Sequence, residues 1–323
     1  MRRAPGFDSM SLILDSILPL FIIIACGWTA IRTRFLDVTV TRALVAYVFY
    51  VATPALLIRA LAHTELPAAP PFALWLSYFL PAVTMLALGT IISRSLYSRP
   101  LPDAIVAGFA SAFSNGVLIG APVILGTYGE AAALPYFLII ALHSPLLFPL
   151  GTLAMEFSRG HAGGAGLALK EGLQQCLRNP IIVSLAVGLA LNLSGMAPAG
   201  PPGRALELLA ESAAPCALFA TGAQLAQYHV ARAVSESLCV TALKLIVMPL
   251  CVAFLGSRVF MLPPEWLAVA CTVAALPSGV NAYLLGNRYH QGIEVATTSI
   301  VLSTLISVLT LPLWLWWFGR ATA

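Results

Sequence analysis

Charged side chains are scarce in this chain: Asp, Glu, Lys and Arg make up 9% of its 323 residues, whereas 59% are hydrophobic. Soluble domains carry about 25% charged residues, so this composition indicates a membrane protein. Segments of about 10 residues with alternating polarity, typical of transmembrane barrels, are lacking. Five windows without charge are each long enough to cross a hydrocarbon core as a helix, which takes about 20 residues: 72–93, 104–129, 131–155, 212–231 and 266–287. We therefore predict an all-α polytopic membrane protein.

Paired cysteines and catalytic signatures are lacking too. No CxxC pair, HExxH, GxSxG or acidic cluster is present, so we expect no metal, no cofactor and no enzymatic activity. The net charge of +4 comes from loop arginines and does not indicate a nucleic-acid partner. The chain has six cysteines, and they lie mostly in apolar segments, where cysteine behaves as a small hydrophobic residue. They are Cys26, Cys176, Cys216, Cys239, Cys251 and Cys271.

Breaks at charged and Pro- or Gly-rich positions divide the chain into ten predicted transmembrane helices. Their ranges are 11–31, 38–60, 72–93, 103–126, 131–157, 177–195, 204–227, 232–256, 265–287 and 293–318. The longest connection, 158–176, is rich in glycine ("SRGHAGGAG") and lies in the middle of the chain. We expect it to be a cytoplasmic linker between a first five-helix repeat, residues 1–157, and a second, residues 177–323.

Lysine and arginine are distributed unevenly over the loops that this division creates. The odd-numbered loops carry ten of them, and the termini and even-numbered loops carry six. Because Lys and Arg accumulate on the cytoplasmic side, we expect the odd loops in the cytoplasm and both termini outside. The larger group consists of Arg32, Arg34, Arg42, Arg94, Arg99, Arg159, Lys170, Arg178, Arg232 and Arg288.

The prolines suggest that the two halves correspond. With five helices per half, the second half enters the membrane in the opposite orientation, so matching halves would form an inverted repeat. Paired Gly or Pro interruptions in corresponding helices are the best sequence indication of a transporter site. Two proline pairs lie 161 and 155 residues apart, and a third occupies spans 3 and 8: Pro54 with Pro215, Pro122 with Pro277, and Pro81 with Pro249.

The fourth span contains the stretch "SNGVLIGAP", which should interrupt a helix. Pro122 has no amide hydrogen and frees a carbonyl one turn upstream. Gly116 and Gly120 let the chain leave helical geometry and allow close backbone approach. Unpaired backbone groups are not tolerated in lipid, so such a break must line a cavity or be paired inside the protein.

The ninth span is expected to break similarly at Pro277 and Ser278, so that the two broken helices cross near the membrane midplane. The ends of the half-helices carry partial charges that can hold a small ion or a carboxylate. Asn115 and Asn281 are the side chains best placed to line this centre, because an amide both donates and accepts hydrogen bonds. The alternative is that each asparagine only caps a half-helix or pairs with a freed backbone carbonyl.

Charged and titratable side chains inside the spans are few. Lys244 is deep within span 8; it would either hold an anionic substrate or neutralise the C-terminal end of a half-helix at the crossing. His143 lies within span 5 and could couple transport to protons, although a hydrogen bond to a neighbouring helix is the commoner role. Asp15 and Glu211 lie near span ends, should face the outer side, and are further candidates for proton coupling.

Several segments resemble the auxin efflux carrier family, which includes plant PIN-formed proteins and bacterial dicarboxylate carriers. They are "FSNGVLIGAPVILGTYG" (113–129), "NPIIVSLAVGLALNLSG" (179–195), "LKLIVMPL" (243–250) and "ALPSGVNAYLLGNRYHQG" (275–292), and the resemblance covers essentially the whole chain. Asn115, Pro122 and Pro277 fall on the family's crossover positions. The long cytoplasmic loop of many plant members is absent, which suggests a bacterial carrier in the inner membrane. "SGVNAY" departs from the plant pattern, which argues against auxin as substrate.

The resemblance implies ten helices in two inverted five-helix repeats, with helices 4 and 9 broken and crossed. It also implies a scaffold domain from helices 1, 2, 6 and 7, a transport domain from helices 3–5 and 8–10, and a homodimer. Family members move organic anions such as malonate or malate by an elevator-type motion. Alternatives are a sodium-coupled organic anion symporter of the same fold type and a membrane receptor or sensor. A receptor would normally carry a soluble domain, and no stretch is polar enough to form one.

Overall fold

The computed structural model describes residues 10–62, 71–160, 166, 178–228 and 233–322. In this described part the chain is helical and contains no strand. Each predicted span coincides with one helix or with a run of consecutive helices. The all-helical membrane class is thereby confirmed, while the crossing of the membrane by all ten segments and the repeat remain predictions. Most of the predicted linker 158–176 lies outside the described residues.

The first half begins with a long helix and contains two interrupted ones. Its elements are α1 Met10–Arg32; α2 Thr39–Tyr47, the π-helical turn η1 Val48–Ala52 and α3 Thr53–Ala62; α4 Phe72–Leu96; α5 Leu101–Ala112, the π-helical turn η2 Gly116–Gly120 and α6 Ala121–Tyr128; and the 3₁₀ turn η3 Glu130–Ala132 followed by α7 Ala133–Ser158.

The second half also contains α-helices that are separated by π-helical turns or by a break. Its elements are α9 Pro180–Ser194; α10 Gly200–Leu225; α11 Val234–Ala242, the π-helical turn η4 Leu243–Val247, α12 Met248–Phe254 and the π-helical turn η5 Leu255–Val259; α13 Pro264–Ala275 and α14 Asn281–Tyr289; and α15 Ile293–Thr322.

Five helical runs of the described chain are long and apolar enough to cross a membrane: Thr39–Ala62, Phe72–Leu96, Glu130–Ser158, Val234–Val259 and Ile293–Phe318. The remaining apolar helices are shorter: Ile17–Arg32, Leu101–Ala112, Gly116–Tyr128, Pro180–Ser194 and Pro264–Ala275. Three of these shorter helices are the halves of interrupted spans, which explains why none reaches the length of a full crossing.

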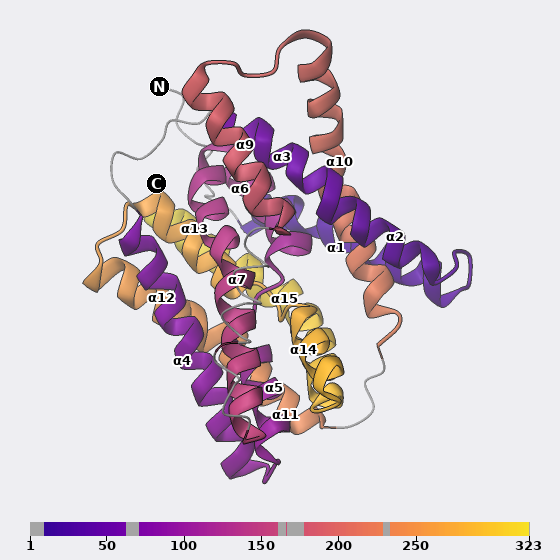
Figure 1. Ribbon diagram of the computed structural model, residues 1–323, viewed down its shortest axis with the longest axis vertical. Coiled ribbons are helices and arrows are strands. Elements are labelled where there is room, and N and C mark those ends of the chain that lie inside the picture. The colour runs from indigo at the N-terminus through magenta and orange to yellow at the C-terminus, as the bar shows by residue number, and fades with distance from the viewer. Residues whose placement is uncertain (1–9, 63–70, 161–165, 167–177, 229–232, 323) are drawn as a thin grey trace.

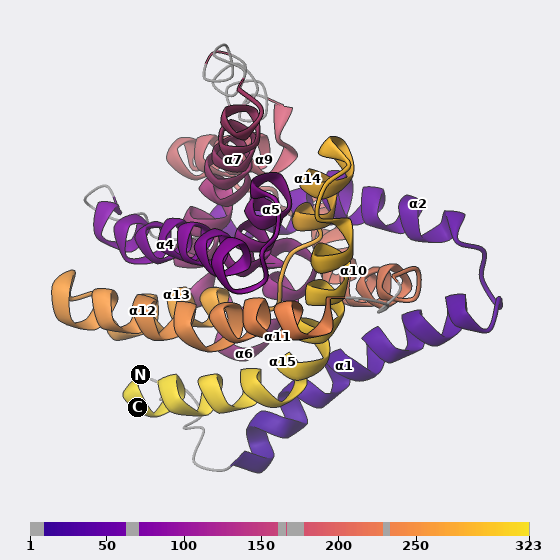
Figure 2. The same cartoon turned by 90° about the horizontal axis from the view of Figure 1, so that it is seen from below.

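The helices pack in two groups. α1 packs against α10, and α3 packs against α9 and α10, whereas α4 packs against α5, and α15 packs against α11 and α13. Figures 1 and 2 place α2 and α10 toward one side of the molecule and α4 and α12 toward the opposite side. Contacts also join the two sets, α1 with α15 and α10 with η2 and α6, and the division into a scaffold and a transport domain stays a prediction.

Glycines allow the closest helix contact in the first group. A Cβ atom on Gly222 of α10 would lie 1.8 Å from the carbonyl oxygen of Ile24 in α1. A Cβ atom on Gly27 of α1 would lie 2.1 Å from the carbonyl oxygen of Phe219 in α10. Small residues let helix backbones approach in this way within membranes, where apolar surface alone gives little driving force for association.

The prolines act differently from the sequence prediction. Pro54, Pro122 and Pro249 each lie two residues after the end of a π-helical turn, and the helices continue through them. The amide of the residue after each π turn, Thr53 in the first case, donates to the carbonyl five residues back. This wider turn accommodates a proline that would otherwise clash with the preceding turn. Pro215 lies inside the continuous helix α10, so its predicted interruption of span 7 was wrong.

Candidate substrate site at the helix crossing

Two interrupted helices meet at their breaks. α5 ends at Ala112 and α13 ends at Ala275, and extended backbone follows each. The amide of Asn115 donates to the carbonyl oxygen of Pro277 over 2.8 Å, and the amide of Gly279 donates to that of Phe113 over 2.8 Å. Ser114 and Ser278 thus form an isolated antiparallel bridge. The two breaks satisfy each other's backbone groups, as an apolar interior requires.

The bridge pairs residues 164 positions apart, Ser114 with Ser278, one from each predicted half of the chain. The pairing of prolines between the two halves of the sequence instead matched Pro122 with Pro277. Pro122 lies in the first turn of α6, beyond the break, whereas Pro277 lies in the break itself. The position of the crossing was predicted closely, but its pairing was shifted by nine residues because the two prolines have different local roles.

Buried hydroxyl groups hold the bridge in place from the surrounding helices. The Tyr78 hydroxyl of α4 lies 3.1 Å from Ser114 Oγ. Ser278 Oγ donates to the carbonyl of Ala110 over 2.8 Å, and the Ser278 amide donates to Ser303 Oγ of α15 over 3.0 Å. Each buried polar group at the crossing that is paired in this way avoids the cost of an unsatisfied hydrogen bond.

His143 of α7 contacts the same bridge. Its Nε2 accepts a long hydrogen bond, 3.4 Å, from the amide of Ser114, and its ring packs edge-on against Phe113 with centroids 4.2 Å apart. An accepting Nε2 means that the ring is neutral in this arrangement. His143 is buried, 3% exposed, and also lines the cavity described next. Its role in proton coupling stays a prediction.

A cavity of about 440 Å³ lies beside the crossing. Asn115, Gly116, Val117 and Leu118 line it from the first interrupted helix, and Gly279, Val280 and Asn281 from the second. These residues begin η2 and α14, and the first turn of a helix leaves amide groups without partners inside the helix. The two helix N-termini therefore present partial positive charge to one cavity.

Asn115 has the most suitable side chain for a ligand in this cavity. It is 6% exposed, and among the described residues its side-chain amide makes no hydrogen bond. Asn281 lines the cavity too, but its Nδ2 donates to Ser144 Oγ of α7 over 3.3 Å. A buried amide without a partner is costly unless a ligand or water completes its hydrogen bonds. The side-chain amide of Asn115 therefore remains available for a ligand or water in this cavity, and its role in binding stays a prediction.

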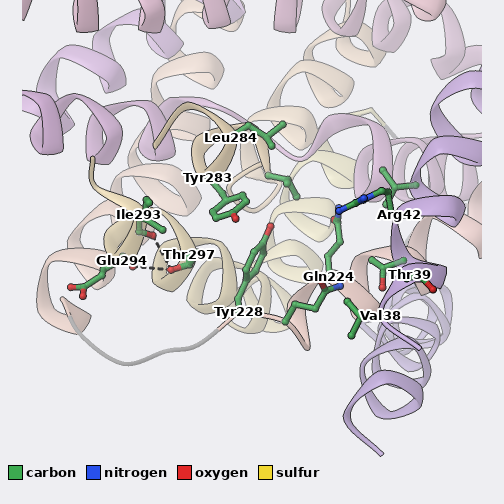
Figure 3. Close-up of a pocket in the computed structure, with 14 residues that line it drawn as sticks. Val38, Thr39, Arg42, Gln224, Tyr228, Tyr283, Leu284, Ile293, Glu294 and Thr297 are labelled. Atoms are coloured by element: carbon green, nitrogen blue, oxygen red, sulfur yellow. Dashed lines mark hydrogen bonds between the residues drawn. The ribbon is translucent and has the colours of Figure 1, made fainter. Parts of the chain in front are cut away.

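A second, wider cavity of about 850 Å³ adjoins the first, and we call it the vestibule. Figure 3 shows Arg42 reaching into it from α2, and Tyr228 and Tyr283 on its wall. The two cavities share their lining at Arg42, Val45, Gln224, Val280 and Leu284. The vestibule also reaches Val38, Gln227 and Glu294, near the loops after α1, α10 and α14. All three are odd-numbered loops, so the cavity is approached from the side predicted to be cytoplasmic.

Lys244 lies next to the crossing but lines neither cavity. It is fully buried on η4, and its Nζ donates to the carbonyl of Ala274 in the last turn of α13. The last turn of a helix carries partial negative charge, which a cation stabilises. Of the two roles that the sequence left open for Lys244, this contact fits the neutralising one.

Gly120 and Glu211, two other predicted residues, line neither cavity. Gly120 packs beside Leu276 and Tyr136, where a Cβ would approach Leu276 Cδ1 to 2.8 Å. Glu211 is exposed on α10 and lines neither cavity. The side chain of Asp15 is outside the described part of the structure, so its predicted coupling role stays a prediction.

Sequence reasoning missed Arg42 and Gln224 as cavity residues. Arg42 was counted only as a charge of the first cytoplasmic loop, although it lies in the first turn of α2. Gln224 belongs to the last turn of α10, and its Oε1 is buried without a hydrogen-bond partner among the described residues. The sequence did contain an indication of their role: each is a polar residue about one turn inside an apolar span, where polar groups tend to face a cavity.

Apolar helices of membrane-spanning length, together with a cavity at the crossing of two interrupted helices, are the arrangement expected of a membrane transporter. The family model described as "Membrane transport protein" matches residues 12–161 and 167–315. The chain belongs to this family, the auxin efflux carrier family that its motifs resemble.

Two relatives illustrate the range of the family. The chain is 27% identical over 301 residues, 93% of its length and 94% of the relative's, to a protein of Rhizobium meliloti (strain 1021) described as "Putative malonate transporter". It is 25% identical over 275 residues, 83% of its length and 85% of the relative's, to an "Uncharacterized transporter" of Methanothermobacter thermautotrophicus. Both descriptions denote transporters, which agrees with the expectation that this protein is not an enzyme.

Proposed function

We propose that this protein is a secondary transporter that moves a small organic anion, a carboxylate or dicarboxylate such as malonate, and binds it at the crossing of the interrupted helices. The unpaired amide of Asn115 in the 440 Å³ cavity carries this proposal. An amide can donate to a carboxylate while the N-termini of η2 and α14 stabilise its charge. The relative described as a malonate transporter supports malonate as the first ligand to test.

The proposed mechanism is elevator-type alternating access. The cavity wall consists partly of the crossing, with α7 and α14, and partly of α2, η1 and α10. The first set belongs to the proposed transport domain, and the second to the proposed scaffold with α1, α3 and α9. If the crossing slides along the scaffold, it carries the anion from the odd-loop side to the even-loop side.

Two further features belong to this proposal. The membrane is proposed to be a bacterial inner membrane, with both termini on the outer side, since the odd loops carry more Lys and Arg. A homodimer through the scaffold helices is proposed from the family resemblance. Coupling to sodium is tested by the measurement below, and proton coupling through His143, Glu211 or Asp15 stays a prediction.

Counterflow in proteoliposomes tests the proposal: unlabelled malonate is trapped inside, and uptake of trace labelled malonate is followed with and without sodium. We expect uptake by the wild type and a loss of about 100-fold in Asn115→Ala, because the variant keeps the backbone bond of the crossing but loses the side-chain hydrogen bond to the charged ligand. Asn287→Ala on the exposed side of α14 is the matched control and should transport normally. Normal uptake by Asn115→Ala would contradict a site at the crossing.

A further inference from the structure

We propose that Arg42 is the group that selects dicarboxylates: it binds the second carboxylate of a ligand whose first carboxylate lies at Asn115. This inference rests on the proposed function, because it assumes an organic anion in the cavity at the crossing. It assigns to α2 a specificity role that is separate from the crossing itself.

The charge of the cavities supports this assignment. Arg42 is the only Lys or Arg among the described residues that line either cavity, and it lines both. No hydrogen bond or ion pair of its guanidinium group is present in the described part of the chain. Glu294 is the only carboxylate on these walls; it is exposed and does not pair with Arg42. A guanidinium group that is not paired with a protein carboxylate remains available for a carboxylate of the ligand.

Two buried polar groups without partners among the described residues line the vestibule together with Arg42. Gln224 Oε1 and Thr41 Oγ1 are both buried and unpaired among the described residues, and both side chains line the vestibule. Figure 3 shows Arg42 and Gln224 from different helices, α2 and α10, facing the same space. Gln224 can accept from the guanidinium group and fix its direction, which leaves the remaining donors for a ligand.

The two proposed anion-binding groups, at Asn115 and at Arg42, belong to different walls of one cavity. We call each of them a pole. Asn115 and the helix N-termini lie on the crossing, and Arg42 lies on α2. A monocarboxylate engages one pole, whereas a dicarboxylate engages both. Because the guanidinium group stays in the first turn of α2, near the odd-loop side, the second contact forms only while the crossing faces that side.

Equilibrium binding to the purified full-length protein tests the inference with two ligands of the same skeleton, malonate and its monomethyl ester. For Arg42→Gln we expect the Kd of malonate to rise about 10- to 100-fold and that of the monoester to change by less than about 3-fold, the range of one lost charge-assisted hydrogen bond. Arg42→Lys keeps the charge without the planar fork and should recover part of the malonate affinity. Arg32→Gln removes an exposed arginine at the end of α1, outside both cavities, and should behave as wild type.

The outcomes separate this inference from the proposed function. If the wild type binds both ligands and Arg42→Gln weakens both equally, or weakens neither, Arg42 does not select dicarboxylates, and the site at the crossing stands. If Arg42→Gln does not fold, Arg42→Lys decides alone: unchanged preference for malonate over the monoester relative to wild type overturns the inference. If the wild type binds neither ligand, the proposed function fails, and this inference fails with it.

Discussion

Lys244 supports the crossing without facing the ligand cavity. Its ammonium group donates to the carbonyl of Ala274 and lies 3.5 Å from Met248 Sδ. In this position it supplies a cation and a donor to the C-terminal end of α13, where the break leaves carbonyl groups without helical partners. A single buried side chain therefore contributes to the stability of one broken helix.

Lys244→Met is predicted to lower stability rather than affinity. The near-isosteric side chain leaves the Ala274 carbonyl unpaired in the interior, which costs about 1–3 kcal/mol, so the thermal midpoint should fall by several degrees. In the protein that remains folded, the Kd of malonate should stay within about 3-fold of wild type, since Lys244 lines neither cavity. Thermal unfolding and equilibrium binding check both parts.

Asn115→Ala serves as the comparison for Lys244→Met, because it should lose binding with little change in midpoint. The opposite result for Lys244→Met, lost malonate binding with an unchanged midpoint, would place Lys244 in the site. The two variants form a matched pair, since both residues lie within apolar spans and next to the same crossing.

At the residue scale the sequence indicated that Asn115 lies at a helix break, where the structure places it beside the cavity, but it did not indicate that Arg42 lines the same cavity. Asn115 follows the end of α5 within a stretch of Gly and Pro, and these residue types constrain the backbone directly. The direction of Arg42 depends on which face of α2 turns toward the cavity. Near a span end an arginine can face a cavity or extend to the headgroups, and the pattern of one sequence does not distinguish these directions.

At the element scale the prolines illustrate what a sequence leaves undetermined. Pro277 lies in a true break, Pro54 and Pro249 follow π-helical turns, and Pro215 is inside a continuous helix. In each case the proline removes one hydrogen bond, but the consequence depends on which partner the freed carbonyl finds. That partner comes from another helix and is visible only in the fold.

The ion pair between Arg59 of α3 and Glu130 of η3 joins the proposed scaffold to the proposed transport domain on the even-loop side. Arg59 Nη2 lies 2.6 Å from Glu130 Oε1, and both side chains are at least partly exposed. An exposed pair of this kind contributes about 0–1 kcal/mol, too little to hold a state alone. The contact between Arg59 and Glu130 must nevertheless break if the crossing moves toward this side.

Linking these two positions is therefore predicted to stop transport. We propose the double variant Arg59→Cys with Glu130→Cys, joined by a short bismaleimide reagent because two long side chains separate the backbones beyond the reach of a disulfide. Malonate counterflow should fall to background after linking, while binding from the open side persists. The two single variants, treated identically, control for native cysteines such as Cys26, which is exposed. Undiminished counterflow by a fully linked protein would contradict the elevator motion.

For the whole molecule, composition was sufficient to predict the class but not the cavity. The low charge and the mean hydropathy of +0.91 indicate a helical membrane protein, and the family match agrees. The cavity is lined by the two crossed breaks and by residues of α2 with η1, α7, α9 and α10, which come from six separate segments of the chain. Their meeting depends on packing between helices, such as that of α1 with α10 through Gly222 and Gly27.

Protection of a cysteine at position 280 from chemical labelling tests whether an organic anion binds beside the crossing. Val280 lines both cavities beside the crossing, so Val280→Cys should react with a small charged maleimide, and malonate should slow that reaction at least about 5-fold by occupying the site. The wild type, treated in parallel, accounts for labelling of native cysteines. The account predicts that Asn115→Ala in the same background abolishes the protection. Labelling of Val280→Cys at the same rate with and without saturating malonate, in a variant that still carries out counterflow, would contradict it.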